Sequence, residues 1–439
     1  MSKPNNSQTI DLFAEEEIDL KKNVGTALLN QFGTKFLQQP QIDKITKTLP
    51  PKLPELSELS ELPQSLQTTQ STQLSLSLQI AQLISRLPEH YTLAVFMFIS
   101  GFITIGLLAA LSKSLKVPFI FPSLGATAFL FFFTPSLPSA SPRNAICGHA
   151  IGVICGYVSL LLFGLAYAPP ASTTGIETSR ILAVGLSLGL TGALMIVFKC
   201  GHPPGGATAL IVSLGIISTP FSLIVLESAV VILALLAIGI NRLASIDYPI
   251  WKRKPKEGIF VAWTPEKAAA TSPSAAITWA IFFFVNGFIT IGILTSISMF
   301  LKIPFIFPSL GATAFLFFFS PNLPSASPRN AICGTAIAIL SAYFALTICG
   351  LTNLSSNVPT ADFQYIIAAA ISLALTGLFM ILLKTPHPPA AATCLIISLG
   401  LVVSPFRLFI LEFAVVLLAL QAFVINRLVA TDYPLWQKK

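Results

Sequence analysis

Charged residues are scarce in this chain. Lys, Arg, Asp and Glu together make up only 10% of its 439 residues, whereas soluble globular domains carry about 25%. Hydrophobic residues reach 54%, and the mean hydropathy is +0.79. This composition excludes an ordinary soluble domain and indicates a membrane protein.

The sequence also has few of the residues on which catalysis and metal binding depend. It contains four histidines, and no HExxH, GxSxG, phosphate-binding-loop or paired-carboxylate pattern occurs. His202 and His387 alone are too sparse for a metal site, so we expect no metal, no cofactor and no enzymatic activity. The six cysteines lie in or beside apolar runs without paired spacing, which is typical of small hydrophobic residues and not of a disulfide framework.

What the chain does contain is a second copy of itself. Residues 118–133 (PFIFPSLGATAFLFFF) recur without change at 304–319, an offset of 304 − 118 = 186. Further along, the segment around His202 reappears around His387, and the offset there is 387 − 202 = 185. Solenoid repeats have periods of about 20–50 residues, so this much longer period indicates two copies of one whole membrane module.

Each copy contains six apolar runs, which do not alternate with polar residues as barrel strands do. Helices are then the structure that satisfies the hydrogen bonds of the backbone N–H and C=O groups in lipid. The second and fifth runs are shorter than the roughly 20 residues that a full span needs. We therefore predict an all-α polytopic protein with four full spans per module and two short helices that either span or re-enter. The predicted helices lie near 92–111, 117–133, 145–168, 181–198, 204–218 and 221–243, and near 277–298, 303–319, 331–350, 365–383, 389–403 and 406–428.

The chain is expected to have four parts: a polar tail (1–90), a first module (91–251), a basic linker (252–276) and a second module (277–436). The tail lacks enough apolar residues for its own core, which is typical of disorder. An even number of spans and the basic linker place the tail, the linker and the C-terminus in the cytoplasm. The lipid bilayer accounts for the net charge of +8, so we expect no nucleic-acid partner. Homo-oligomer formation stays open.

The two short runs of each copy begin alike. Residues 122–128 (PSLGATA) resemble residues 203–209 (PPGGATA), 203 − 122 = 81 residues later. Three spans per half would make the halves inverted repeats, as in secondary transporters whose half-helices meet near the membrane midplane. The free N–H groups and partial positive charge at a helix start bind anions. The alternative is that these small residues serve tight helix packing.

Several ionisable residues within or beside the apolar runs recur in both copies. A charged group inside the bilayer is costly, so each is a candidate functional residue. Glu227 and Glu412 lie inside the last run of each copy, where each serves either proton coupling or a structural ion pair. For Glu227 the expected partner in such a pair is Arg143 or Lys199. His202 precedes a short run and could bind an anion or relay a proton, because histidine ordinarily titrates near neutral pH.

Three stretches resemble the signature of the HPP family of integral membrane proteins, named for His-Pro-Pro: FPSLGATAFL at 121–130, SPRNAICGH at 141–149 and GHPPGGATAL at 201–210. The resemblance covers both modules and omits the tail. The family includes carriers of nitrite in chloroplast and cyanobacterial membranes. The resemblance therefore implies transport of a small monovalent inorganic anion, with nitrite as the leading substrate. It also implies the plasma membrane of a cyanobacterium or, alternatively, a chloroplast envelope.

We predict that the anion binds between the starts of the two short helices. The residues assigned to this site are Ser123, Gly125, Thr127, Arg143, Asn144, Lys199, His202, Gly205, Gly206, Thr208, Thr313, Arg329 and His387. In copy two, Ala390 and Ala391 replace Gly205 and Gly206, and Thr335 replaces His149. Whether copy two has a working site therefore stays an open question. A sensory or scaffolding protein and a membrane-embedded enzyme are the alternative functions.

Overall fold

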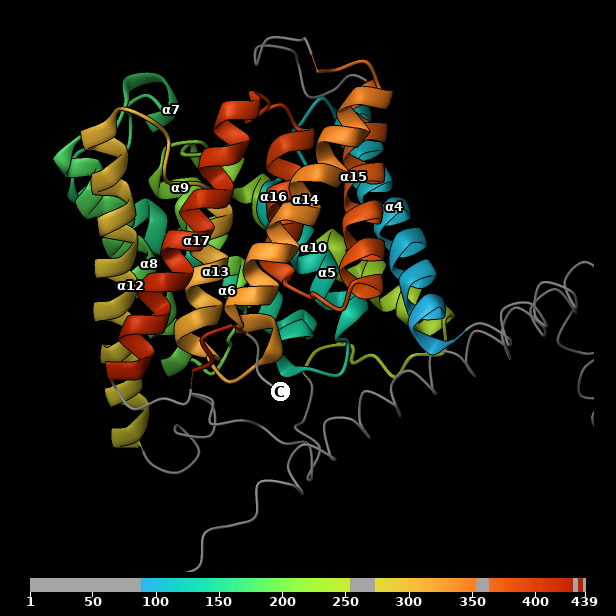
Figure 1. Cartoon of the computed structure of the whole chain (residues 1–439), viewed down its shortest axis with the longest axis horizontal. Helices are drawn as coiled ribbons and strands as arrows, with labels where there is room; N and C mark the ends of the chain where they lie inside the picture. Colours follow the sequence, from blue (N-terminus) through green and yellow to red (C-terminus); the bar gives the residue numbers. More distant parts are fainter. Residues whose placement is uncertain (1–87, 253–272, 353–362, 429–432, 437–439) are drawn as a thin grey trace, which may run out of the picture. The chain divides into compact units, whose positions relative to one another are not determined.

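The computed structural model describes residues 88–252, 273–352, 363–428 and 433–436 of the chain. Within these ranges, 8 helices are long and apolar enough to cross a membrane, and Figure 1 shows them with the shorter helices between them. The described residues contain no β-strand, so the predicted all-α polytopic fold is confirmed. Residues 1–87 of the predicted tail and most of the basic linker lie outside the described residues, and α4 takes up the last two residues of the predicted tail.

Each module has the same order of helices, which is long, short, long, and then long, short, long again. The first module contains α4 (Glu89–Leu115), α5 (Pro122–Phe133), α6 (Pro142–Leu162), α8 (Thr178–Val197), α9 (Pro204–Ser213) and α10 (Pro220–Leu243). The second contains α12 (Pro273–Leu301), α13 (Pro308–Phe319), α14 (Pro328–Ile348), α15 (Phe363–Leu382), α16 (Pro388–Ser398) and α17 (Pro405–Leu428). Four full-length helices and two short ones per module agree with the prediction.

The short helices α5 and α9 occupy only part of the apolar runs that contain them. α5 has 12 residues and begins at Pro122, because the preceding residues 118–121 are not helical. α9 ends at Ser213, just before Gly215 adopts a φ of 75°, which suits a residue without a Cβ. Twelve residues rise about 18 Å, so neither helix alone crosses a hydrocarbon core of about 30 Å.

Proline sets most of the helix starts. Nine of these twelve helices begin at a proline. At the first helical position proline loses no hydrogen bond and its φ already matches the helix, so each such start is fixed by local chemistry. The rule explains why α13, which repeats the sequence of α5, starts at the equivalent residue, Pro308.

Among the described residues, 88–93 and 240–247 belong to one compact unit, whereas 94–239 and those from 248 onward belong to another. The second unit holds most of both modules, and within it the long helices pair across the modules. α12 packs along α8, and α15 lies beside α4 (Figure 1). The short helices also cross between modules, with α5 packed on α16 and α13 packed on α9. The two sequence repeats therefore interlock.

Glycine permits both crossings of the short helices. A Cβ added to Gly125 on α5 would collide with the carbonyl oxygen of Ala391 on α16. A Cβ added to Gly311 on α13 would collide in the same way with the carbonyl oxygen of Gly206 on α9. Because Gly125 and Gly311 are equivalent positions of the repeat, the two crossings share one design. Small residues allow this close backbone approach between membrane helices.

A buried tyrosine near the end of each module fastens a short turn that follows the first short helix. These turns are the 3-10 helices η2 (Pro138–Ala140) and η3 (Pro324–Ala326). The hydroxyl of Tyr248 donates to the carbonyl of Ala140 at 2.6 Å, and the hydroxyl of Tyr433 donates to the carbonyl of Ala326 at 2.7 Å. Each tyrosine therefore ties the end of its module to the turn before α6 or α14.

Tyr248→Phe is expected to lower the free energy of unfolding by about 1–3 kcal/mol, because a buried carbonyl loses its hydroxyl donor. Denaturant unfolding of the purified protein in detergent micelles measures this change. Tyr433→Phe should have a similar effect, since its environment is equivalent. Tyr167, which is 96% exposed, offers the control Tyr167→Phe. Equal stability of the Tyr248→Phe and Tyr167→Phe proteins would contradict the role of the Tyr248 hydroxyl.

Candidate functional site

Residues from separate signature stretches meet inside module 1. Thr127 on α5, His149 on α6, His202 before α9 and Thr208 on α9 are all fully buried. Oγ1 of Thr127 lies 2.8 Å from Nε2 of His149 and 3.1 Å from Nε2 of His202. Nδ1 of His149 lies 2.7 Å from Oγ1 of Thr208. Side-chain hydrogen bonds thus join both short helices of the module through two histidines.

His202 is held at both of its ring nitrogens. Its Nδ1 lies 2.7 Å from the carbonyl oxygen of Ser139. A carbonyl can only accept, so Nδ1 carries the proton and Nε2 of the neutral ring accepts from Thr127. His202 lies in the connection between α8 and α9, and burial lowers the pKa of its imidazole to about 4, although the bond to Ser139 acts in the opposite direction. His202 is therefore neutral at pH 7.

Module 2 contains a reduced version of this cluster. Oγ1 of Thr313 lies 3.2 Å from Nε2 of His387, and Nδ1 of His387 donates to the carbonyl of Ser325 at 2.8 Å. The position of His149 is taken by Thr335, which is buried. In module 2, His387 thus still joins the first short helix to the turn by hydrogen bonds, but the second imidazole is absent.

Arg143 and Asn144, which the sequence assigned to substrate binding, lie at the end of α8. The guanidinium of Arg143 donates to the carbonyls of Lys199 at 2.8 Å and Phe198 at 3.1 Å, and to Oδ1 of Asn144 at 3.0 Å. Basic side chains that bind the last carbonyls of a helix stabilise its end. Arg329 makes the equivalent backbone contact in module 2. The structure therefore gives these arginines a helix-capping role.

Lys199 ends α8 through its own backbone. Its φ is 52°, and the N–H groups of Lys199 and Cys200 donate to the carbonyls of Ile196 and Met195. This is the Schellman ending of a helix, where a basic residue also favours the helix dipole. Three further lysines at helix ends share the positive φ: Lys116, Lys302 and Lys384. The recurrence of these lysines therefore has a local structural reason.

The glycines at the start of α9 are packed against protein. A Cβ on Gly205 would lie 2.5 Å from the carbonyl oxygen of Gly148 on α6, and one on Gly206 would lie 2.7 Å from that of Gly311 on α13. Neighbouring helix backbones thus fill the space that an anion was expected to use. The expectation that these glycines let a ligand approach is corrected, and tight helix packing accounts for them.

Unused hydrogen-bonding capacity is found at the start of the first short helix of each module. The side chains of Ser123 and Ser309 are 0% and 2% exposed, and neither hydroxyl has a hydrogen-bond partner among the described residues. The preceding residues, Phe121 and Phe307, make no side-chain cap. Buried polar groups are normally hydrogen-bonded. A buried hydroxyl without a partner at a helix start is therefore a candidate ligand-binding group, because a ligand could supply the missing hydrogen bond.

Glu412 lies level with the start of α13. The ring of its neighbour Phe413 is 6.1 Å from that of Phe305, which precedes α13. Farther along α17, Nδ2 of Asn426 donates to the carbonyl of Phe317 near the end of α13. The two contacts are separated by similar numbers of residues along both segments, so α17 runs parallel to α13. Glu412 therefore lies at the height of the residues that lead into α13.

The carboxylate oxygens of Glu227 and Glu412 are buried and have no hydrogen-bond partner among the described residues. The structural ion pair considered for Glu227 is therefore not formed. Its suggested partner Arg143 uses its guanidinium on carbonyl oxygens at the end of α8. A role of the two glutamates in proton coupling stays a prediction.

His149 was not among the site residues predicted from the sequence. It lies within the stretch SPRNAICGH, where a histidine in the middle of an apolar helix was the available signal. Its two partners, Thr127 and Thr208, are on the short helices on either side of it in the sequence. Only the fold shows that one imidazole joins both.

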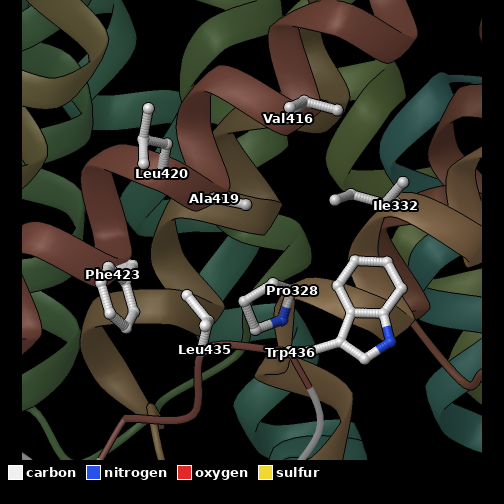
Figure 2. Close-up of a pocket in the computed structure, with 8 residues that line it drawn as sticks. All are labelled: Pro328, Ile332, Val416, Ala419, Leu420, Phe423, Leu435 and Trp436. Carbon is white, nitrogen blue, oxygen red and sulfur yellow. The ribbon is translucent and has the colours of Figure 1, made fainter.

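An apolar groove lies between α14, α17 and the C-terminal residues Leu435 and Trp436 (Figure 2). No charged or hydroxyl-bearing side chain lines it, and Figure 2 shows Trp436 at its edge. The remaining lining residues are Pro328, Ile332, Val416, Ala419, Leu420 and Phe423. The groove therefore has no charged group or hydroxyl that would hold an anion.

Comparison with known proteins gives consistent matches. Residues 87–249 and 272–434 each match one family model, described as the HPP transmembrane region. Two transmembrane proteins of Dictyostelium discoideum are similar. One is 37% identical over 118 residues, which are 26% of this chain and 35% of the relative, and the other is 34% identical over 134 residues, which are 29% and 44%. The chain thus spans less than half the length of these curated relatives. No solved structure matches it.

Proposed function

Because the chain belongs to the HPP family of membrane proteins through both of its modules, we propose that it carries a small monovalent anion across a membrane, with nitrite as the leading substrate. The anion crosses chemically unchanged, so the protein is a transporter and not an enzyme. The choice of nitrite as the leading substrate rests on the resemblance of the signature stretches to the family. The anion class is supported by the physical chemistry of the helix starts.

The observation that supports this function most is the pair of unpartnered hydroxyls at Ser123 and Ser309. Each lies in the first turn of a half-length helix that begins inside a helical bundle and has no side-chain cap. The free N–H groups there and the partial positive charge of the helix start favour an anion. The serine hydroxyl adds one further donor. The two modules each offer one such place.

The chemistry of these places favours a single negative charge. The short helices α5, α9, α13 and α16 contain no charged residue, so their donors are neutral hydroxyl and amide groups. Removing an ion from water costs more as its charge rises, and a few neutral donors offset the cost for a monovalent ion more readily than for a divalent one. A small planar anion with two oxygen acceptors, such as nitrite, fits this set of donors.

The proposed location follows the same resemblance. The protein is a multi-pass integral membrane protein. We place it in the plasma membrane of a bacterium, where the predicted cytoplasmic position of the basic linker would orient it.

Uptake into liposomes that contain only the purified protein tests the function. Nitrite, nitrate, chloride and formate are compared at equal concentration, with protein-free liposomes as the baseline. We expect protein-dependent nitrite uptake that saturates and that the other monovalent anions inhibit to different degrees, while sulfate has no effect. Absence of uptake of all four anions by folded, correctly inserted protein would contradict a transport function.

A further inference from the structure

Four hydrogen bonds in series link α9 to the turn before α6 in module 1. They run from Thr208 to His149, from His149 to Thr127, from Thr127 to His202, and from His202 to the carbonyl oxygen of Ser139. All lie between 2.7 and 3.1 Å. The four side chains are completely buried, so no bulk water competes for these bonds.

The carbonyl at the end of the series determines where each proton lies. The Ser139 carbonyl accepts from Nδ1–H of His202, which leaves Nε2 of a neutral ring as an acceptor. Thr127 has one hydroxyl proton. The carbonyl oxygen of Ser123, 3.1 Å from Oγ1 of Thr127, is a second acceptor for it, but donation to His202 avoids two lone pairs facing each other. His149 then donates from Nε2–H to Thr127 and accepts the hydroxyl proton of Thr208 at Nδ1. Every donor is used once, and the series is neutral as a whole.

A further proton enters this series without breaking it. It binds to Nδ1 of His149 after the Thr208 hydroxyl rotates to become the acceptor. The excess charge then moves when His149 passes its Nε2 proton to Oγ1 of Thr127 and Thr127 passes its own proton to Nε2 of His202. One proton from the aqueous phase is bound, no other bond is lost, and the two imidazoles share a single positive charge.

The surroundings supply no fixed countercharge for that proton. Apart from the two histidines, the ionisable residues on α5, α6, α8, α9, on the connections beside them and on the crossing helix α16 are Lys116, Arg143, Cys147, Cys155, Tyr157, Tyr167, Glu177, Arg180, Lys199, Cys200 and Cys394, with Tyr248 packed against α5. The only carboxylate among these described residues, that of Glu177, is exposed at the start of α8 and interacts with Arg180. On α10, both carboxylate oxygens of Glu227 lack a hydrogen-bond partner. A buried positive charge without a partner is costly, so a mobile anion is its natural counterion.

We infer that His149 and His202 form a shared proton-binding site, and that module 1 takes up one proton together with one anion. This inference rests on the proposed function and names its driving ion. By linkage, the anion raises the affinity of the histidine pair for the proton, and the proton raises the affinity for the anion by the same factor. Module 2 binds no such proton, because Thr335 replaces the second histidine.

Proton binding is measured without transport, by nitrogen NMR of the full chain labelled with 15N-histidine. The chain has four histidines, and single His→Gln variants assign their signals. In a titration from about pH 8 to pH 4, which brackets the ordinary range of histidine, we expect His149 and His202 to bind one proton together, and 50 mM nitrite to move this titration toward higher pH. His149→Thr should abolish it, and His387 should not change.

Two variants show whether the proton belongs to the histidine pair or to the carboxylate of Glu227 on α10. His149→Thr copies the residue that module 2 already accommodates at this position, so it is suited to fold. Glu227→Gln removes the unpartnered carboxylate and should leave the shared titration intact. If both histidines stay neutral throughout the pH range with nitrite present, or titrate independently of each other, the shared site is refuted.

Coupling is measured in liposomes as initial nitrite uptake under an imposed pH gradient, corrected for protein-free liposomes. An outside-acid gradient of one unit should speed wild-type uptake by up to about tenfold. His149→Thr should lose this acceleration, while Thr335→Val, at the equivalent place of module 2, should keep both the uptake and its acceleration. Shared titration without any uptake would refute the proposed function alone, whereas uptake that is equally accelerated in His149→Thr would refute the coupling alone.

Discussion

Gly125→Ala and Gly311→Ala are each expected to prevent correct assembly of the protein. The new methyl group would collide with a backbone carbonyl oxygen of the partner helix, that of Ala391 or that of Gly206. A backbone carbonyl cannot move aside as a flexible side chain can, so the two short helices must separate. Overpacking costs about 1–3 kcal/mol where side chains can adjust, and we expect the cost here to exceed that range.

The measurement is the fraction of protein that elutes as a monodisperse peak after detergent extraction, together with its thermal midpoint. Gly292→Ala on α12 is the matched control, because nothing lies within 4 Å of the added methyl group and alanine favours a helix over glycine by about 0.5–1 kcal/mol. If Gly125→Ala or Gly311→Ala were as stable as Gly292→Ala, the interlocked packing of the two modules would be wrong.

The double substitution Ser123→Ala with Ser309→Ala is expected to slow nitrite uptake at least about tenfold. Each change removes one hydrogen bond to a charged ligand, which contributes about 1.5–3 kcal/mol. Folding should be unaffected or improved, because a buried hydroxyl without a protein partner is removed. Initial uptake per inserted protein in liposomes is the measurement. The two single variants then show how much each module contributes.

The chain provides a close control for this experiment. Ser213 and Ser398 are also fully buried, and their hydroxyls also have no partner among the described residues. They are the last residues of α9 and α16, where the helix dipole is negative and disfavours an anion. Ser213→Ala with Ser398→Ala should leave uptake unchanged. Equal losses from the two double variants would show that the helix starts are not the binding sites.

Much of the fold could be predicted from the sequence because apolar runs and a tandem repeat are both local signals. The predicted helix over residues 117–133 is too long at its start, since hydropathy does not register that Pro118 and Pro122 keep the intervening residues out of the helix. The crossing of helices between modules could not be predicted. Two copies with the same order of apolar runs and the same short-helix sequence contain no signal that tells a contact within a module from one between modules.

The candidate site was predicted in part. The signature stretches assigned Thr127, His202 and Thr208 to one site, and hydrogen bonds through His149 and to His202 join them in one cluster. Anion binding by these residues stays a prediction. Arg143 and the glycines of α9 were expected to contact the anion. In the structure, the guanidinium of Arg143 instead binds carbonyl oxygens at the end of α8, and neighbouring helix backbones pack against the glycines. Residue type indicates what a side chain can bind, but the packing decides which partner it meets.

The most direct test of anion binding at the helix starts is to locate a bound anion by anomalous X-ray diffraction from crystals of the protein soaked in bromide. Bromide is a small monovalent anion with a strong anomalous signal, and competition with nitrite in the uptake assay establishes that it uses the same site. We predict anomalous peaks within hydrogen-bonding distance of the hydroxyls of Ser123 and Ser309, displaced by added nitrite. Peaks confined to other places, or no nitrite-sensitive peak in crystals of transport-active protein, would contradict binding at these helix starts.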